Sequence, residues 1–74
     1  MNDYKNMEKF GRRLADLRLQ SGKKQREVAK ALGVTPQAVS KWERGLSCPD
    51  ILMLGELASA LGVAIADLFE ANAR

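Results

Sequence analysis

The sequence predicts one small all-α domain, a compact bundle of five helices. Gly22, Gly33, Gly45 and Gly62 each follow a stretch with helical periodicity. Glycine is the usual residue just past a helix C-terminus, because it has no Cβ to clash in the left-handed conformation. No run of four or more residues alternates convincingly between apolar and polar side chains, and β-branched residues are few. The glycines therefore separate helices rather than strands.

Apolar residues at helical spacing place the helices between these glycines. The three clearest stripes are Phe10, Leu14, Leu17 and Ser21, then Val28, Ala29 and Leu32, then Leu54, Leu57, Ala58 and Leu61. We expect helices at residues 7–21, 25–32, 36–44, 50–61 and 65–70. Residues 1–74 then form a single domain, with an ordered core at about 7–70 and a short N-terminal arm at 1–6.

Two of these helices carry start signals of their own. Thr35 followed by Pro36 is a cap residue and then a proline at the first helical position, where the missing N–H costs nothing. Pro49 and Asp50 open the next long helix in a similar way, with a carboxylate near the positive end of the helix dipole.

Composition excludes most catalytic and metal chemistry. The chain of 74 residues has no histidine, so the commonest general base and metal ligand is missing. Its single cysteine, Cys48, cannot form an internal disulfide, a redox pair or a zinc site. The longest apolar run, residues 51–54, is far short of a membrane span, and the first residues lack the apolar core of a signal peptide. We expect a cytoplasmic protein that is not an enzyme, with no catalytic residues, no metal, no cofactor and no membrane partner.

Charge is divided unevenly along the chain. Residues 1–45 hold 11 basic and 5 acidic side chains, a balance of +6, whereas residues 46–74 hold 1 basic and 4 acidic, a balance of −3. A basic half suits a polyanion, and an acidic half suits a different partner. Chance scatter in a short chain explains the split equally well, so charge alone does not decide between them.

Residues 25–45 are the segment with a recognisable function. They read as a short helix, a tight turn at Gly33 and a second short helix, which is the helix-turn-helix pattern. Ala29 is small enough to let the two helices pass closely, and Val34 can pin the turn to the core. We expect Val39 and Trp42 to anchor the second helix.

A helical wheel separates the two faces of that second helix. At about 100° per residue, Ser40, Lys41 and Arg44 lie within about 60° of Gln37, opposite the apolar side. This set suits DNA, because amides pair with base edges and cations with guanine or phosphate. An ordinary amphipathic helix with a solvated polar face has the same distribution of polar and apolar residues around its axis. The turn, the cap and the local positive charge favour the DNA-binding interpretation.

Glu43 flanks the apolar side of the same helix, and Arg18 flanks the apolar stripe of the first helix. A carboxylate there needs a partner if it is desolvated. We therefore predict an Arg18–Glu43 pair that positions the recognition helix. The alternative is that both side chains are exposed and contribute little to stability.

With these features, the chain resembles the Cro/repressor-type helix-turn-helix family, the Xre-like regulators that include phage repressor and Cro proteins. The resemblance covers about residues 7–70, with its motifs in order and at the family's spacing. They are Leu14-x-x-Leu17-Arg18, Gln25-x-x-Val28-Ala29-x-x-Leu32-Gly33-Val34, Val39-Ser40-x-Trp42-Glu43-x-Gly45, Pro49-Asp50-Ile51-x-x-Leu54 and Leu57-Ala58-x-x-Leu61-Gly62-Val63-x-x-x-Asp67-Leu68.

The resemblance implies a lambda-repressor-like five-helix bundle whose third helix, about 36–44, enters the major groove of double-stranded DNA. Gln25 would bind a phosphate and brace the start of that helix, and Arg18 and Glu43 match the family's buried pair. Positions 36, 37 and 41 would face base edges, with the others near the backbone or groove wall. Carried over by position, the DNA-binding residues are Gln25, Thr35, Pro36, Gln37, Ser40, Lys41 and Arg44.

Three positions depart from the family pattern. Pro36 replaces a residue that is often polar, so base readout must depend on Gln37 and Lys41, with apolar contact from the proline to a thymine methyl. Lys24 replaces the usual Ser or Thr cap of the second helix, which weakens that cap but adds a candidate phosphate contact. Lys23 stands where an apolar residue is common.

One recognition helix reads only a few base pairs, so specific binding calls for a homodimer on an inverted-repeat operator. The candidate dimer contacts, which lie in the acidic half, are Leu52, Met53, Ile65, Leu68 and Phe69. Most of these residues could instead close the small core. The predicted function is a sequence-specific transcriptional regulator, a bacterial or phage-type repressor that joins the nucleoid when bound to DNA. The alternative is an antitoxin or adaptor module that uses the fold to hold a protein partner.

Overall fold

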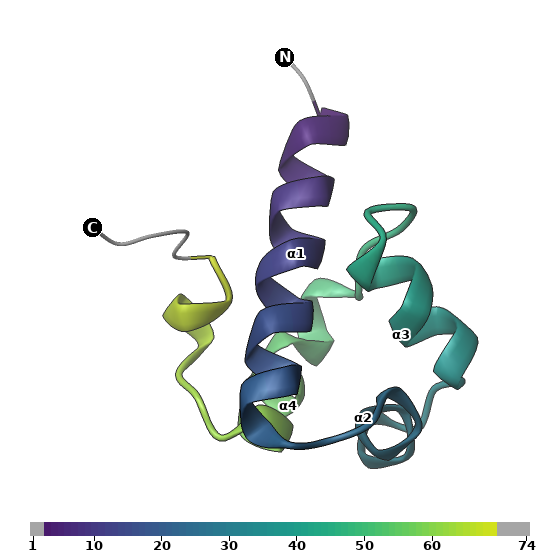
Figure 1. Cartoon of the computed structure of the whole chain (residues 1–74), viewed down its shortest axis with the longest axis vertical. Coiled ribbons are helices and arrows are strands. Elements are labelled where there is room, and N and C mark those ends of the chain that lie inside the picture. The colour runs from purple at the N-terminus through teal and green to yellow at the C-terminus, as the bar shows by residue number, and fades with distance from the viewer. Residues whose placement is uncertain (1–2, 70–74) are drawn as a thin grey trace.

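Four α-helices and two short 3₁₀ helices make up the computed structural model over residues 3–69, the residues that it describes (Figure 1). In chain order they are α1 (Asp3–Ser21), α2 (Gln25–Leu32), α3 (Pro36–Glu43), η1 (Ile51–Met53), α4 (Leu54–Leu61) and η2 (Ile65–Leu68). The all-α prediction is confirmed, and residues 3–69 contain no strand. The predicted count of five helices is wrong, because two of the expected segments form or contain 3₁₀ turns.

The start of the chain is more helical than predicted. Helix α1 begins at Asp3, so most of the expected N-terminal arm at 1–6 belongs to the helix. Residues 1–2 of that arm lie outside the described residues. At the other end of the helix-turn-helix, α3 stops at Glu43, and Arg44 is its C-cap.

The expected helix at 50–61 breaks at Leu54. The Asp50 carbonyl accepts the N–H of Met53 at 2.8 Å, and the Asp50 carboxylate accepts the N–H of Leu52 at 3.0 Å. The first bond closes a 3₁₀ turn before α4 starts, since it joins residues three apart rather than four, and the second caps the start of that turn.

The expected helix at 65–70 is a single 3₁₀ turn. The Asp67 carboxylate accepts the N–H of Ala64 at 2.9 Å, and the Ala66 carbonyl accepts the N–H of Phe69 at 3.1 Å. The second bond joins residues three apart, which identifies the turn as 3₁₀ rather than α. Residue 70 lies outside the described residues.

The core unites the apolar stripes of all four α-helices with η2. Val34 packs against it from the turn, where Gly33 adopts a φ of +73°. The prediction of Leu68 as a dimer contact is wrong, because its side chain is fully buried here. The buried apolar residues are Leu14, Leu17, Val28, Ala29, Leu32, Val39, Trp42, Leu57, Ala58, Leu61 and Leu68.

Helix α1 meets the last turn of α3 at Gly11. A Cβ at this position would lie 2.6 Å from the Glu43 carbonyl oxygen and closer still to that of Trp42. No real side chain tolerates such distances, so the approach requires glycine. The next glycine in this contact is Gly45, whose Cβ would lie 2.9 Å from the Cα of Glu8. The end of α3 therefore rests directly on the backbone of α1.

The predicted Arg18–Glu43 pair is present. Arg18 Nε donates to Glu43 Oε2 at 2.5 Å and Nη2 donates to Oε1 at 3.1 Å, with the two side chains 13% and 7% exposed. The hydrogen bond to Glu43 raises the pKa of Arg18 above its ordinary value, against the opposing effect of burial. The guanidinium also donates to the Lys23 carbonyl at 2.9 Å. One cation thus ties α1 to α3 and to the turn before α2.

Gln25 completes this cluster, and its position corrects an expectation. Its amide nitrogen donates to Glu43 Oε1 at 2.9 Å, so the residue braces the last residue of α3 rather than the start of that helix. Glu43 therefore accepts hydrogen bonds from both α1 and α2, and the three helices of this half of the molecule meet at its carboxylate.

We expect Gly11→Ala to destabilise the fold by about 1–3 kcal/mol, because the new methyl group collides with backbone that cannot move independently. Gly55→Ala is the matched control, since a Cβ there meets only Ile65 Cδ1, at 3.9 Å. Its better helix propensity should stabilise α4 by about 0.5–1 kcal/mol. Urea unfolding followed by circular dichroism measures both, and equal gains in the two variants would contradict the close approach.

We expect Glu43→Ala to cost about 2–4 kcal/mol, because it leaves the largely buried Arg18 charge and the Gln25 amide without their acceptor. Glu56→Ala, at an exposed acid on α4, should stay within about 0.5 kcal/mol of the wild type. The double variant Arg18→Leu, Glu43→Leu should lose less than Glu43→Ala, since no unpaired charge remains. A melting temperature of Glu43→Ala equal to that of the wild type would contradict a stabilising role for the pair.

Candidate nucleic-acid interface

Helix α3 lies on one flank of α1 (Figure 1). The helix presents a polar face to solvent. Gln37 and Lys41 on this face are exposed, and Ser40 is half-buried. On the opposite face Val39 and Trp42 are buried in the core. Because the apolar face is fixed inside, the rotation of the helix about its axis is determined, and the amide and the ammonium group have to face outward.

The start of α3 is capped as the sequence predicts. The Thr35 hydroxyl oxygen accepts the N–H of Ala38 at 3.1 Å, and Pro36 occupies the first turn. Both residues are exposed. Pro36 offers no side-chain hydrogen bond, so the leading end of the helix presents a rigid apolar surface beside the Gln37 amide.

The end of α3 carries the second cation of the face. Arg44 is the C-cap, and its Nε donates to the Ser40 carbonyl one turn earlier at 3.4 Å. The Lys41 carbonyl accepts the N–H of Leu46 at 2.9 Å across Gly45, which ends the helix. Arg44 is thereby directed along its own helix while it remains exposed.

The start of α2 adds two more lysines beside this surface. Lys24 is the N-cap residue and makes no side-chain cap bond, but Glu27 accepts its backbone N–H at 2.7 Å and so supplies half of a capping box. Lys23 and Lys24 are both exposed. The Arg18 guanidinium bonds both the Lys23 carbonyl and Glu43, so this turn lies next to the end of α3. Lys23 and Lys24, which both depart from the family pattern, thus increase the positive charge beside α3.

Most of the predicted site residues lie on this one surface, and Gln25 is the partial exception. Its side chain is half-buried, with one amide hydrogen engaged by Glu43. An amide nitrogen has two donors, so the second remains for an external acceptor.

Sequence reasoning missed the contribution of Gly11. A glycine inside a helical pattern costs about 1 kcal/mol relative to alanine, which is a signal that some other helix passes close by. The sequence alone does not say which helix that is.

The described part of the chain holds no group of three or more His, Cys, Asp or Glu side chains arranged to bind a metal ion. Within the same residues, no helix combines the length and apolar character needed to cross a membrane.

Known proteins share this arrangement. A model of the helix-turn-helix family matches residues 14–68. An uncharacterised helix-turn-helix transcriptional regulator of the SPβ prophage of Bacillus subtilis, YonR, is 41% identical over 54 residues, or 73% of this chain. The chain spans about half the length of that relative, since the match covers 50% of it.

Two solved structures extend the likeness. The restriction-modification controller protein C.AhdI from Aeromonas hydrophila has a TM-score of 0.87 and 32% identity, covering 93% of this chain and 100% of that one. The P22 c2 repressor, solved in complex with a synthetic operator, has a TM-score of 0.76 and 28% identity, covering 85% and 96%. With the family model matched over most of its length, the chain belongs to the Cro/repressor-type helix-turn-helix family of DNA-binding transcription regulators.

Proposed function

We propose that this regulator is a sequence-specific repressor that inserts α3 into the major groove of double-stranded DNA as a homodimer. The observation that carries the proposal is the orientation of α3. Its apolar side is buried, its last turn is held on α1, and its exposed side presents Gln37 and Lys41. The solved P22 c2 repressor, which is bound to an operator, supports DNA as the ligand of a surface with this fold.

The side chains of α3 divide into two groups by chemistry. Gln37 and Lys41 read base edges, because an amide pairs with adenine and an ammonium group donates to guanine. Pro36 contributes apolar contact to a thymine methyl. Contacts to phosphate position the protein without specifying sequence, and we assign them to Arg44, Ser40, Thr35 and the free amide hydrogen of Gln25.

A homodimer follows from the size of the reading surface. Helix α3 is 8 residues long and spans only a few base pairs. Two copies on an inverted repeat, with half-sites about one turn of DNA apart, supply the remaining specificity. A protein-holding adaptor would not need the cations of this face, which favours DNA over the antitoxin or adaptor alternative.

We expect selection from a random duplex pool to enrich an inverted repeat. On the enriched duplex, Gln37→Ala and Lys41→Ala should each weaken binding by about 1–3 kcal/mol and relax the preference at the bases they contact. Fluorescence anisotropy on the enriched duplex and on duplexes with single base changes measures both effects.

Two further variants, one control and one phosphate-contact variant, complete this experiment. Gln20→Ala removes an exposed amide from α1 and should leave binding unchanged. Arg44→Ala should weaken binding to all sequences alike and lower the slope of log affinity against log salt by about one unit. Unchanged affinity and selectivity in both Gln37→Ala and Lys41→Ala would contradict the assignment of these residues to base contacts. A pool without enrichment would favour the adaptor alternative.

A further inference from the structure

The helices α1 to α4 end in the same backbone turn. A glycine N–H bonds a carbonyl three residues back, and the next N–H bonds a carbonyl five residues back. This turn is the Schellman motif, which brings the residue after the glycine close to the residue five positions earlier, where an apolar contact commonly forms. In α2 it joins Val34 to Ala29, and in α4 it joins Val63 to Ala58. These four residues belong to the core or pack against it.

At the end of α3 the same turn joins two residues that lie outside the core. The Leu46 N–H bonds the Lys41 carbonyl at 2.9 Å, and Gly45 precedes Leu46. Leu46 is 59% exposed, and Lys41 is exposed as well. Gly45 itself is buried, in close approach to the backbone of Glu8 in α1. The backbone that carries Leu46 is therefore held against α1, whereas its side chain lies at the surface.

No polar partner fixes the direction of the Lys41 side chain. Among the described residues, its ammonium group forms no hydrogen bond or ion pair. Arg44, the other cation at this end of α3, is directed by its bond to the Ser40 carbonyl at 3.4 Å. A lysine that is ordered only when it binds loses rotamer freedom at that moment, and this loss weakens binding. The methylene stem is therefore the part of Lys41 through which the protein can orient it.

The chemistry of Leu46 suits this task. Lysine side chains lay their methylene groups along apolar surface while the ammonium group stays in water. A leucine covered in this way exposes less apolar area to water, which stabilises the arrangement. Leucine has no hydrogen-bond donor or acceptor for a base edge or a phosphate, so its influence on base readout has to pass through a neighbouring side chain.

We propose that Leu46 is a positioning residue for Lys41. Its side chain packs along the Lys41 stem and directs the ammonium group toward a base edge. The proposal rests on the base contact that the proposed function assigns to Lys41. It makes a residue beyond the end of α3 a determinant of sequence preference. If Leu46 served instead to contact a deoxyribose or a protein partner, the order of the Lys41 stem in the free protein would not depend on it.

NMR spectroscopy of ¹³C-labelled protein without DNA tests the contact. We expect nuclear Overhauser effects between the Leu46 methyl groups and the methylene protons of Lys41. The order parameter at Lys41 Cδ should fall in Leu46→Ala and keep its wild-type value in Leu46→Met, whose unbranched apolar chain still covers the stem. Leu19→Ala is the matched control, because it truncates another exposed leucine, 65% exposed, on α1. It should leave the order at Lys41 unchanged.

Binding to the enriched duplex tests the consequence for readout. Leu46→Ala should weaken binding about three- to tenfold, the expected effect of ordering one more side chain on binding. The loss should largely vanish on a duplex changed at the base pair where Lys41→Ala relaxes the preference. Leu46→Met should bind like the wild type. In the Lys41→Ala background, Leu46→Ala should cause no further loss.

Two results would overturn the proposal. One is an order parameter at Lys41 that is the same in Leu46→Ala and in the wild type. The other is a set of losses that add in the double variant, because Leu46 would then act on DNA independently of Lys41. The NMR measurement uses no DNA. A pool without enrichment would therefore count against the proposed function, while the order at Lys41 still decides whether Leu46 positions it.

Discussion

The contact between the last turn of α3 and α1 is the constraint on which the exposed polar face of α3 depends. Helix α3 has 8 residues, and a helix this short is not stable by itself in water. Its position therefore comes from tertiary contacts: the close approach at Gly11 and the Glu43 carboxylate, which accepts hydrogen bonds from Arg18 and Gln25. Since Val39 and Trp42 also fix the rotation of the helix, the same contacts that stabilise the fold aim Gln37 and Lys41 outward.

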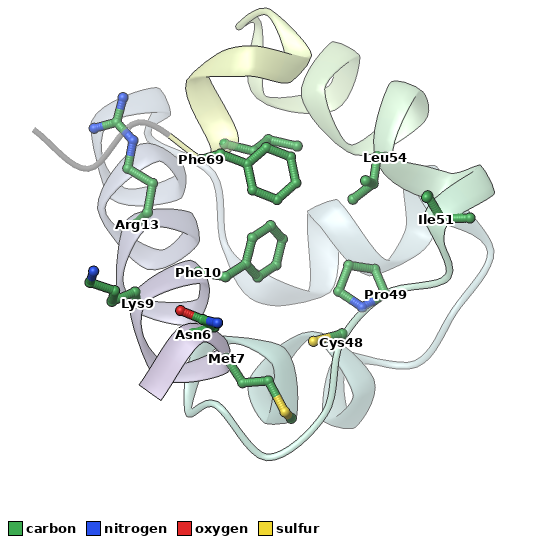
Figure 2. Close-up of a pocket in the computed structure, with 11 residues that line it drawn as sticks. Asn6, Met7, Lys9, Phe10, Arg13, Cys48, Pro49, Ile51, Leu54 and Phe69 are labelled. Carbon is green, nitrogen blue, oxygen red and sulfur yellow. The ribbon is translucent and has the colours of Figure 1, made fainter. Parts of the chain in front are cut away.

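Helix α1 also separates two surfaces of different character. On one flank is α3 with its cations, and on the other is an apolar groove lined by Phe10, Ile51 and Phe69 (Figure 2). The net charge of +3 is the sum of a basic first part and an acidic second part. Six of the basic residues of the first part, Lys23, Lys24, Arg26, Lys30, Lys41 and Arg44, lie in or beside the helix-turn-helix. The positive charge and the apolar groove therefore lie on different flanks of α1.

Sequence periodicity predicted the features that depend on local spacing. The core stripes and the Arg18–Glu43 pair follow from which residues share a helix face, and the Thr35 cap follows from its place directly before Pro36. Apolar spacing does not distinguish a 3₁₀ turn from an α-turn, so the break at Leu54 and the short η2 could not be predicted. The role of Gly11, the bond from Gln25 to Glu43 and the burial of Leu68 depend on which elements meet, which is long-range information that no single stripe contains.

Mapping of backbone amide shifts tests the central claim most directly, that the exposed face of α3 is the DNA-binding surface. ¹⁵N-labelled protein would be titrated with the duplex enriched from a random pool and, in parallel, with a duplex of scrambled sequence. We expect the largest shift changes at residues 35–44 and at the start of α2 with the enriched duplex, and smaller changes with the scrambled one. Changes concentrated around the groove or on α4, with residues 35–44 unaffected, would contradict the account.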